Sequence, residues 1–174
     1  MKKIASPQLI VPVYAGWVYQ VEHVARDGSV KSVETVKNLM PTNARNYVLN
    51  ASFKGGTQYA TLYLGLYDNN RTPVAGDTMV EVAAEYGENV DYTGSERATI
   101  SLPAVANGAT NTLSSPNEFN FTTSESIRGA FISSSPTWSG STGVLISAVL
   151  FSSPKTVGNG ETLRVPVGFA LLSA

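Results

Sequence analysis

The chain has 174 residues, a length that suits one domain able to bury a hydrophobic core without disulfides. Charged residues make up 14% of it, the formal net charge is −1, and it contains no cysteine and one histidine, His23. The lack of cysteine excludes disulfides, thiolate catalysis and cysteine-based zinc sites. Because no Lys/Arg-rich run is present, neither nucleic acid nor an anionic membrane is expected as a partner. We expect no catalytic residues, no metal and no cofactor.

The first fifteen residues are predicted to form an extended N-terminal arm, followed by a single β-rich domain over residues 16–174. Pro7 and Pro12 do not fit inside a helix, and each lacks a backbone N–H. Such an arm can cross onto a neighbouring subunit. The arm side chains that we expect to contact a partner are Leu9, Ile10, Val11, Val13 and Tyr14.

A period-two pattern over 16–22, with Trp17, Tyr19 and Val21 on one face and Val18, Gln20 and Glu22 on the other, predicts a half-buried β-strand. Asp27-Gly28 favours a type I′ turn, and residues 30–36 then return as the partner strand of a hairpin. His23 lies in this hairpin, where we expect a structural role because no second histidine can share a metal ion. The side chains expected on the buried face are Trp17, Tyr19 and Val21.

One short α-helix is predicted at about 42–54. Thr42 or Asn43 can cap its first amides, and Gly55-Gly56 can end it because glycine adopts the left-handed conformation without strain. Apolar residues that fall on one helical face at i, i+3, i+4 and i+7 are Ala44, Tyr47, Val48 and Ala51.

Short strands separated by turn sequences are predicted after the helix, whereas residues 78–86 fit either a short helix or a loop. Together with the first hairpin they favour a mainly β, single-domain β-sandwich or jelly-roll-like fold. The predicted strands cover 59–67, 97–102, a segment with Phe119 and Phe121, 127–133, 144–151 and 163–171.

Six of the 13 acidic residues fall within the segment 77–96. Clustered carboxylates could hold Ca²⁺ or supply a paired-carboxylate glycosidase site, but their spacing matches no EF-hand loop. We therefore expect a solvated acidic face. The acids are Asp77, Glu81, Glu85, Glu88, Asp91 and Glu96.

A Ser/Gly-rich loop over 133–143 carries one aromatic residue, Trp138, at its centre. Aromatic rings flanked by small polar residues recur in binding loops, so Trp138 is a candidate for contacting a partner. The alternative is a ring that folds back over the edge of its own sandwich. The sequence leaves both open.

Several segments resemble a family of small virion-associated proteins of tailed bacteriophages and prophages, over residues 16–172. Family members commonly carry Trp-Tyr where this chain has Leu62-Tyr63, and Gly-Trp-x-Glu where it has 84–87. The segments that carry the resemblance are VETVKNLMPTNARNYVLNASFKGGTQYATLYLGLYDN (33–69), AGDTM (75–79), I-x-GAF (127–131), SG-x-x-GVL (139–145) and VGNGETLRV (157–165).

The resemblance implies a capsid decoration or cement protein that is located in the virion, binds the outer head surface and stabilises the shell through contacts between subunits. Its implied partners are the major capsid protein or other virion proteins. We expect a homo-oligomer and favour a trimer. A tail- or fibre-associated module that recognises a host-surface carbohydrate or protein, with Trp138 as the contact, is the alternative. An enzyme acting through the segment 77–96 is a third hypothesis.

Overall fold

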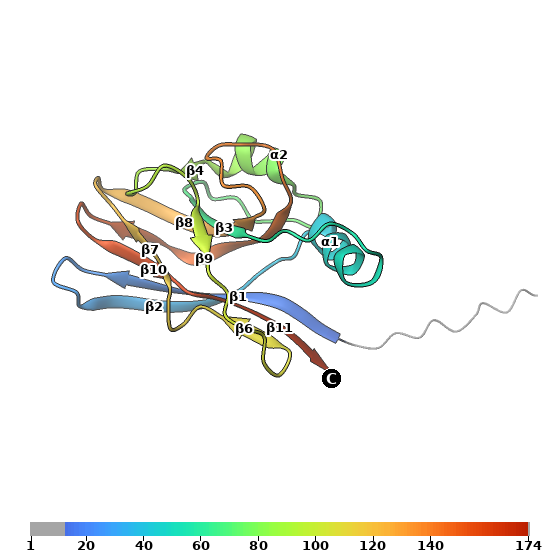
Figure 1. Cartoon of the computed structure of the whole chain (residues 1–174). Helices are drawn as coiled ribbons and strands as arrows, with labels where there is room; N and C mark the ends of the chain where they lie inside the picture. Colours follow the sequence, from blue (N-terminus) through green and yellow to red (C-terminus); the bar gives the residue numbers. More distant parts are fainter. Residues whose placement is uncertain (1–12, 174) are drawn as a thin grey trace, which may run out of the picture.

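The structure is a computed structural model that describes residues 13–173, and it confirms a β-sandwich-like domain (Figure 1). Two antiparallel sheets pack face to face around a common core; the jelly-roll connectivity stays a prediction. The first sheet contains β1 (Val13–Val24), β2 (Val30–Lys37), β6 (Ala109–Asn111), β7 (Asn117–Asn120), β10 (Thr162–Val165) and β11 (Val167–Ser173). The second contains β3 (Leu62–Tyr67), β4 (Glu88–Asn89), β5 (Ala98–Ile100), β8 (Glu125–Ser133) and β9 (Leu145–Val157).

Strand β1 organises the first sheet. It pairs with β2 on one edge, and with β11 and then β10 on the other. The predicted closing strand 163–171 is therefore present, but Pro166 divides it into two because proline lacks the N–H that a continuous ladder needs. The Pro166 carbonyl still accepts a hydrogen bond from the Gln20 N–H at 3.0 Å. The predicted hairpin of β1 and β2 is confirmed, with Gly28 at a φ of 84° in its turn. The predicted type I′ turn is wrong, because that type needs a positive φ at both central residues and Asp27 does not have one.

The core lies between the sheets and includes the three side chains predicted for the inner face of β1, Trp17, Tyr19 and Val21. Polar groups also join the two layers. The Tyr19 hydroxyl donates to Ser147 Oγ on β9 at 2.7 Å, and Asn38 Nδ2 donates to the same oxygen at 2.8 Å. The bond to Ser147 satisfies the Tyr19 hydroxyl, which would otherwise be costly to bury.

Helix α1 (Thr42–Phe53) confirms the predicted helix, and it ends as expected with Gly55 at a φ of 67°. Its start differs from the prediction. Pro41 is the N-cap residue and no side chain caps the helix; Thr42 Oγ1 instead accepts a bond from Arg45 Nη2 at 3.0 Å.

The fold contains a second helical segment, so the prediction of one helix is incomplete. It consists of α2 (Met79–Glu81) followed by the π-helical turn η1 (Val82–Tyr86). Thr78 and Glu81 form a reciprocal capping box at its start. The Thr-x-x-Glu signature of that box is visible in the sequence. Of the two possibilities for residues 78–86, the structure shows the helix.

Both described ends of the chain lie at the end of the sandwich beside α1 (Figure 1). The predicted arm falls mostly outside the described residues: this applies to Leu9, Ile10 and Val11, whereas Val13 and Tyr14 belong to β1. Residues 13–15 are therefore part of the sheet. Neither helix in the described range is long and apolar enough to span a bilayer.

Candidate functional site

The prediction that the acidic segment 77–96 forms a solvated face is wrong for Asp77 and Glu88, which are buried, whereas Glu85, Asp91 and Glu96 are exposed. Asp77 is buried, and its carboxylate accepts bonds from the Tyr86 hydroxyl at 2.8 Å, the Val74 N–H at 2.7 Å and Arg71 Nη2 at 2.8 Å. Burial, followed by the bond to Asp77, raises the pKa of Tyr86 well above its usual value. Glu85 is exposed but pairs with the same arginine, Nε to Oε2, at 2.7 Å. The acids in this part of the segment therefore serve its packing.

Glu88 and Arg97 form a buried ion pair. The Glu88 side chain is 1% exposed and the Arg97 side chain 0%. The pair is bidentate, with Nε–Oε1 and Nη2–Oε2 both at 2.7 Å. It also anchors the loop 133–143, because Glu88 Oε2 accepts from the Ser139 N–H at 2.7 Å and Arg97 Nη1 donates to the Ser135 carbonyl at 3.0 Å. Among residues 13–173, no three His, Asp or Glu side chains are placed to share a metal ion.

Trp138 takes the folded-back arrangement, one of the two left open by the sequence. Its Nε1 donates to the Tyr92 hydroxyl at 3.0 Å, and the two rings meet edge to face with centroids 5.5 Å apart. The indole is half-buried against the core, and burial raises the pKa of Tyr92 to about 12. Trp138 thus helps to close this edge of the sandwich.

His23 has the structural role expected of it. Its Nε2 lies 2.7 Å from Glu161 Oε2, and Glu161 also pairs with Lys31 and accepts a bond from the Gly158 N–H at 2.9 Å. These bonds, first that of Lys31, then those of Gly158 and His23, lower the pKa of Glu161 to about 2. The cluster ties the first hairpin to the turn between β9 and β10.

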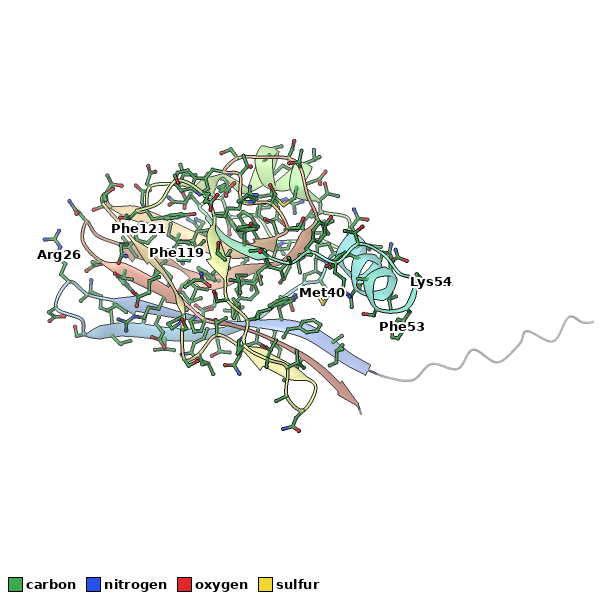
Figure 2. The ribbon with its side chains drawn as sticks, in the orientation of Figure 1. Arg26, Met40, Phe53, Lys54, Phe119 and Phe121 are labelled. Carbon is green, nitrogen blue, oxygen red and sulfur yellow. The ribbon has the colours of Figure 1, made fainter. Side chains whose placement is uncertain are left out.

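An open apolar hollow lies between α1 and the ends of β1 and β11, and we call it the α1 groove. Its volume is about 470 Å³. Figure 2 shows Met40 between the helix and the strands, with Phe53 at the end of the helix. Three side chains in it remain largely open to solvent: Phe53 is 78% exposed, Leu49 55% and Leu171 49%. The groove is lined by Ala15, Met40, Arg45, Val48, Leu49, Ser52, Phe53, Phe169 and Leu171.

The groove exists because the inner face of the β1–β11 ribbon continues past the core. Trp17 pairs with Phe169, and their rings contact each other with centroids 5.2 Å apart. One residue pair further along the same face, Ala15 stands opposite Leu171, and both are exposed. Paired residues share a face of the sheet. The apolar surface of that face is therefore covered at the pair Trp17–Phe169 and exposed at the next pair on the same face, Ala15–Leu171.

Of the apolar α1 residues that line this groove, only Val48 lies on the face predicted from sequence; Leu49 and Phe53 were not predicted. The predicted face includes Ala44, which is buried, and Tyr47, which packs on the core. Leu49 and Phe53 lie on a second stripe of the helix at i and i+4, a spacing that the sequence displays but does not assign. Their exposure follows from tertiary packing.

Beside the groove, the outer edge of β1 is open; we call it the β1 edge. The Trp17 N–H donates to Asn38 Oδ1 at 3.0 Å, just beyond the last pair between β1 and β2, Val18 with Lys37. Before Trp17, no strand within 13–173 pairs along this edge. A second hollow of about 420 Å³ lies there, lined by Ala15, Gly16, Asn38, Leu39, Met40, Arg45 and Ala75.

Compared with models of protein families and with curated protein sequences, the chain shows no match to either. Function is therefore inferred from the site and from the sequence resemblance. An apolar groove next to an unpaired strand edge suits polypeptide partners, which supply both apolar side chains and main-chain hydrogen bonds. The charged residue in the lining of both hollows is Arg45.

Proposed function

We propose that the protein is a structural component of a phage virion, a capsid decoration protein that binds the outer head surface and stabilises the shell. The resemblance of the sequence to virion-associated proteins supports this proposal. The observation that carries it is the α1 groove, an open apolar hollow on the β-sandwich. The proposal assigns no reaction to the chain.

The groove suits an apolar segment of the major capsid protein. Covering Phe53, Leu49 and Leu171 to the extent that they are now exposed would contribute roughly 3–6 kcal/mol before the cost of immobilising the partners. Such an affinity is modest for one copy. Many copies on a symmetric shell would add their contacts, and the decorated particle would gain stability from their number.

The rim of the groove adds a charge preference. Arg45 is exposed on α1 and keeps donors beyond the one that it directs to Thr42 Oγ1. A guanidinium prefers carboxylates, which it can bind in a bidentate manner. The expected capsid segment therefore carries apolar side chains next to an aspartate or glutamate.

Retention on capsids tests the proposal. The purified chain is added to expanded, undecorated heads of the phage that encodes it, and bound protein is measured after sedimentation. Leu49→Ser and Phe53→Ser should each reduce retention about tenfold or more, since each removes an apolar contact.

Val33→Ser is the matched control, because Val33 is 56% exposed against 55% for Leu49 but lies on β2. It should bind as the wild type does. Absence of retention of the wild-type chain would refute the function. Equal losses from the groove and control variants would refute the groove as the contact. Binding to tails but not to heads would assign the protein to the tail instead of the head.

A further inference from the structure

Two asparagines of the chain stand directly before a glycine, in the steps Asn107-Gly108 and Asn159-Gly160. At such a step the glycine nitrogen can attack the asparagine side chain with little hindrance, because glycine has no Cβ. Both asparagines are exposed, and neither carboxamide forms a hydrogen bond with any residue of 13–173. The two steps are therefore alike in sequence and exposure, and they differ in how the fold holds the glycine N–H.

The fold holds the Gly160 N–H in a hydrogen bond. This N–H donates to the Phe121 carbonyl at 2.8 Å, and the Phe121 N–H donates to the Glu161 carbonyl at 3.0 Å. The Asn159 carbonyl also accepts a bond from Arg26 Nε. A base must therefore break the bond to Phe121 before it can remove the Gly160 amide proton.

The Gly108 N–H is held differently, because no atom in the described part of the chain accepts a hydrogen bond from it. Asn107 has a φ of 50° and Gly108 a φ of 73°, the two positive values that a type I′ turn needs. Ala106 and Ala109 close this turn with two main-chain bonds of 3.0 Å, and the Gly108 carbonyl accepts from the Leu171 N–H at 2.9 Å. Gly108 is exposed, so water and base reach its N–H without breaking any of these bonds.

The position of the turn also favours a reaction at Asn107. The attack forms a ring between the side chain and the next nitrogen, which requires the turn to open locally. The strand that follows the turn, β6, has three residues and lies at an edge of the first sheet, where β11 is its partner. Short segments at a sheet edge open at a small fraction of the global free energy of unfolding.

We propose that Asn107 is a site of spontaneous deamidation in the folded protein, whereas Asn159 is protected. Hydroxide removes the Gly108 amide proton, and the nitrogen attacks Asn107 Cγ. The bond between Gly108 N and Cγ forms, the Cγ–Nδ2 bond breaks, and the leaving group takes a proton from water to give ammonia. Water then opens the cyclic succinimide at either carbonyl. Cleavage at Cγ gives aspartate, and cleavage at the main-chain carbonyl gives isoaspartate.

Either product replaces a neutral carboxamide by a carboxylate. Isoaspartate also routes the main chain through Cβ, which adds a methylene to a two-residue turn whose backbone geometry is narrowly defined. The pairing of Ala106 with Ala109 and the bond to the Leu171 N–H should then be lost. Leu171 lines the α1 groove, so the change loosens one wall of that groove. This last consequence alone concerns the proposed function, because components of an assembled particle are not replaced as it ages.

Peptide mapping by mass spectrometry tests the proposal. The purified full-length chain is incubated at mildly alkaline pH, and conversion of each amide to a carboxylate is followed by its mass gain, with isoaspartate separated from aspartate by chromatography. Asn107 should react about tenfold or more faster than Asn159, because the Gly160 N–H must first lose its hydrogen bond. Amide hydrogen exchange should show the same order, with Gly108 close to the rate of an unfolded peptide and Gly160 slower.

Two controls separate the fold from the sequence. In urea both glycine N–H groups are open, so Asn107 and Asn159 should react at similar rates. Asn107→Gly removes the carboxamide but keeps a residue that adopts positive φ without strain, so it preserves the turn. After the same incubation the wild-type chain should melt at a lower temperature than before, and the Asn107→Gly chain should not.

Equal rates at the two asparagines of the folded chain, a faster reaction at Asn159, or a difference that persists in urea would each overturn the proposal. Protection of the Gly108 N–H from hydrogen exchange would overturn it as well. The deamidation goes beyond the proposed function, and its measurement needs no capsid. A chain that does not bind heads therefore refutes only the function, and a stable Asn107 refutes only the modification.

Discussion

The ion pair of Arg97 and Glu88 should be the polar interaction on which stability depends most. The Glu88 side chain is only 1% exposed, and Arg97→Leu would leave its carboxylate without a counter-charge. The substitution would also remove the Arg97 donor to the Ser135 carbonyl. Removing one partner of a buried pair typically costs about 3–5 kcal/mol, most of which is the desolvation of the remaining charge. We expect a loss in that range.

Urea unfolding followed by circular dichroism measures this loss as a change in the midpoint at constant slope. In a domain of this size, about 1 kcal/mol shifts the melting temperature by about 2–4 °C, so Arg97→Leu should melt roughly 6–20 °C below the wild type. Arg164→Leu is the control. Its guanidinium also contacts a carboxylate through Nε, that of Glu118 at 2.6 Å, but the two side chains are 36% and 45% exposed. Solvent screens such a pair, and the control should lose at most about 1 kcal/mol.

The double variant Arg97→Leu/Glu88→Leu removes both charges, and so distinguishes the cost of an unpaired buried charge from the loss of the other hydrogen bonds that the pair makes. It should be more stable than Arg97→Leu alone, because no unpaired charge remains buried. The Ser139 N–H would still lose its acceptor, so part of the loss should persist. If Arg97→Leu cost no more than Arg164→Leu, or if the double variant were the less stable one, the reasoning about burial would be refuted.

Three further predictions concern other parts of the fold. Glu161, with its pKa lowered to about 2 from 4.5, contributes stability that is present above pH 4.5 and is lost as the pH falls through 2. In Glu161→Gln the free energy of unfolding, measured in urea at each pH, should therefore fall less steeply in that window; an unchanged slope would contradict this. Gly129→Ala would place a Cβ 2.1 Å from Tyr67 Cζ and should cost about 1–3 kcal/mol, whereas Gly76→Ala, with no atom within 4 Å, should stay within about 0.5 kcal/mol. Trp138→Ala should cost about 2 kcal/mol, less than a fully buried tryptophan, and leave capsid retention unchanged; lost retention in a folded variant would return the ring to the binding surface.

Local chemistry made much of the fold predictable. Alternation over 16–22 predicted a strand and its buried face, because side chains on a strand alternate whatever lies around them. Gly28 and Gly55 were placed at a turn and at a helix end by a backbone conformation that other residues adopt only under strain, and both have positive φ in the structure. The Thr-x-x-Glu spacing of the Thr78–Glu81 capping box is also present in the sequence. The spacing alone, however, does not show whether the two side chains form their hydrogen bonds, so the sequence does not distinguish a helix from a loop there.

The electrostatic pairs could not be read in this way. Arg71 and Arg97 lie six residues before Asp77 and nine after Glu88, and no helical or strand spacing links either pair. Only the fold brings each arginine to its carboxylate and removes water from both. A cluster of acids in the sequence therefore suggested a solvated face, when two of its members are buried.

By itself, the sequence determined the class of the fold, its first hairpin and the span of its main helix, because these depend on periodicity and on residues adjacent in the chain. Only the tertiary structure decided which apolar side chains stay open. Leu49, Phe53 and Leu171 differ little in character from residues of the core, and they are exposed because they line the open hollow between α1 and the ends of β1 and β11. Burial is a property of the assembled layers, and no pattern along the chain reports where a layer ends.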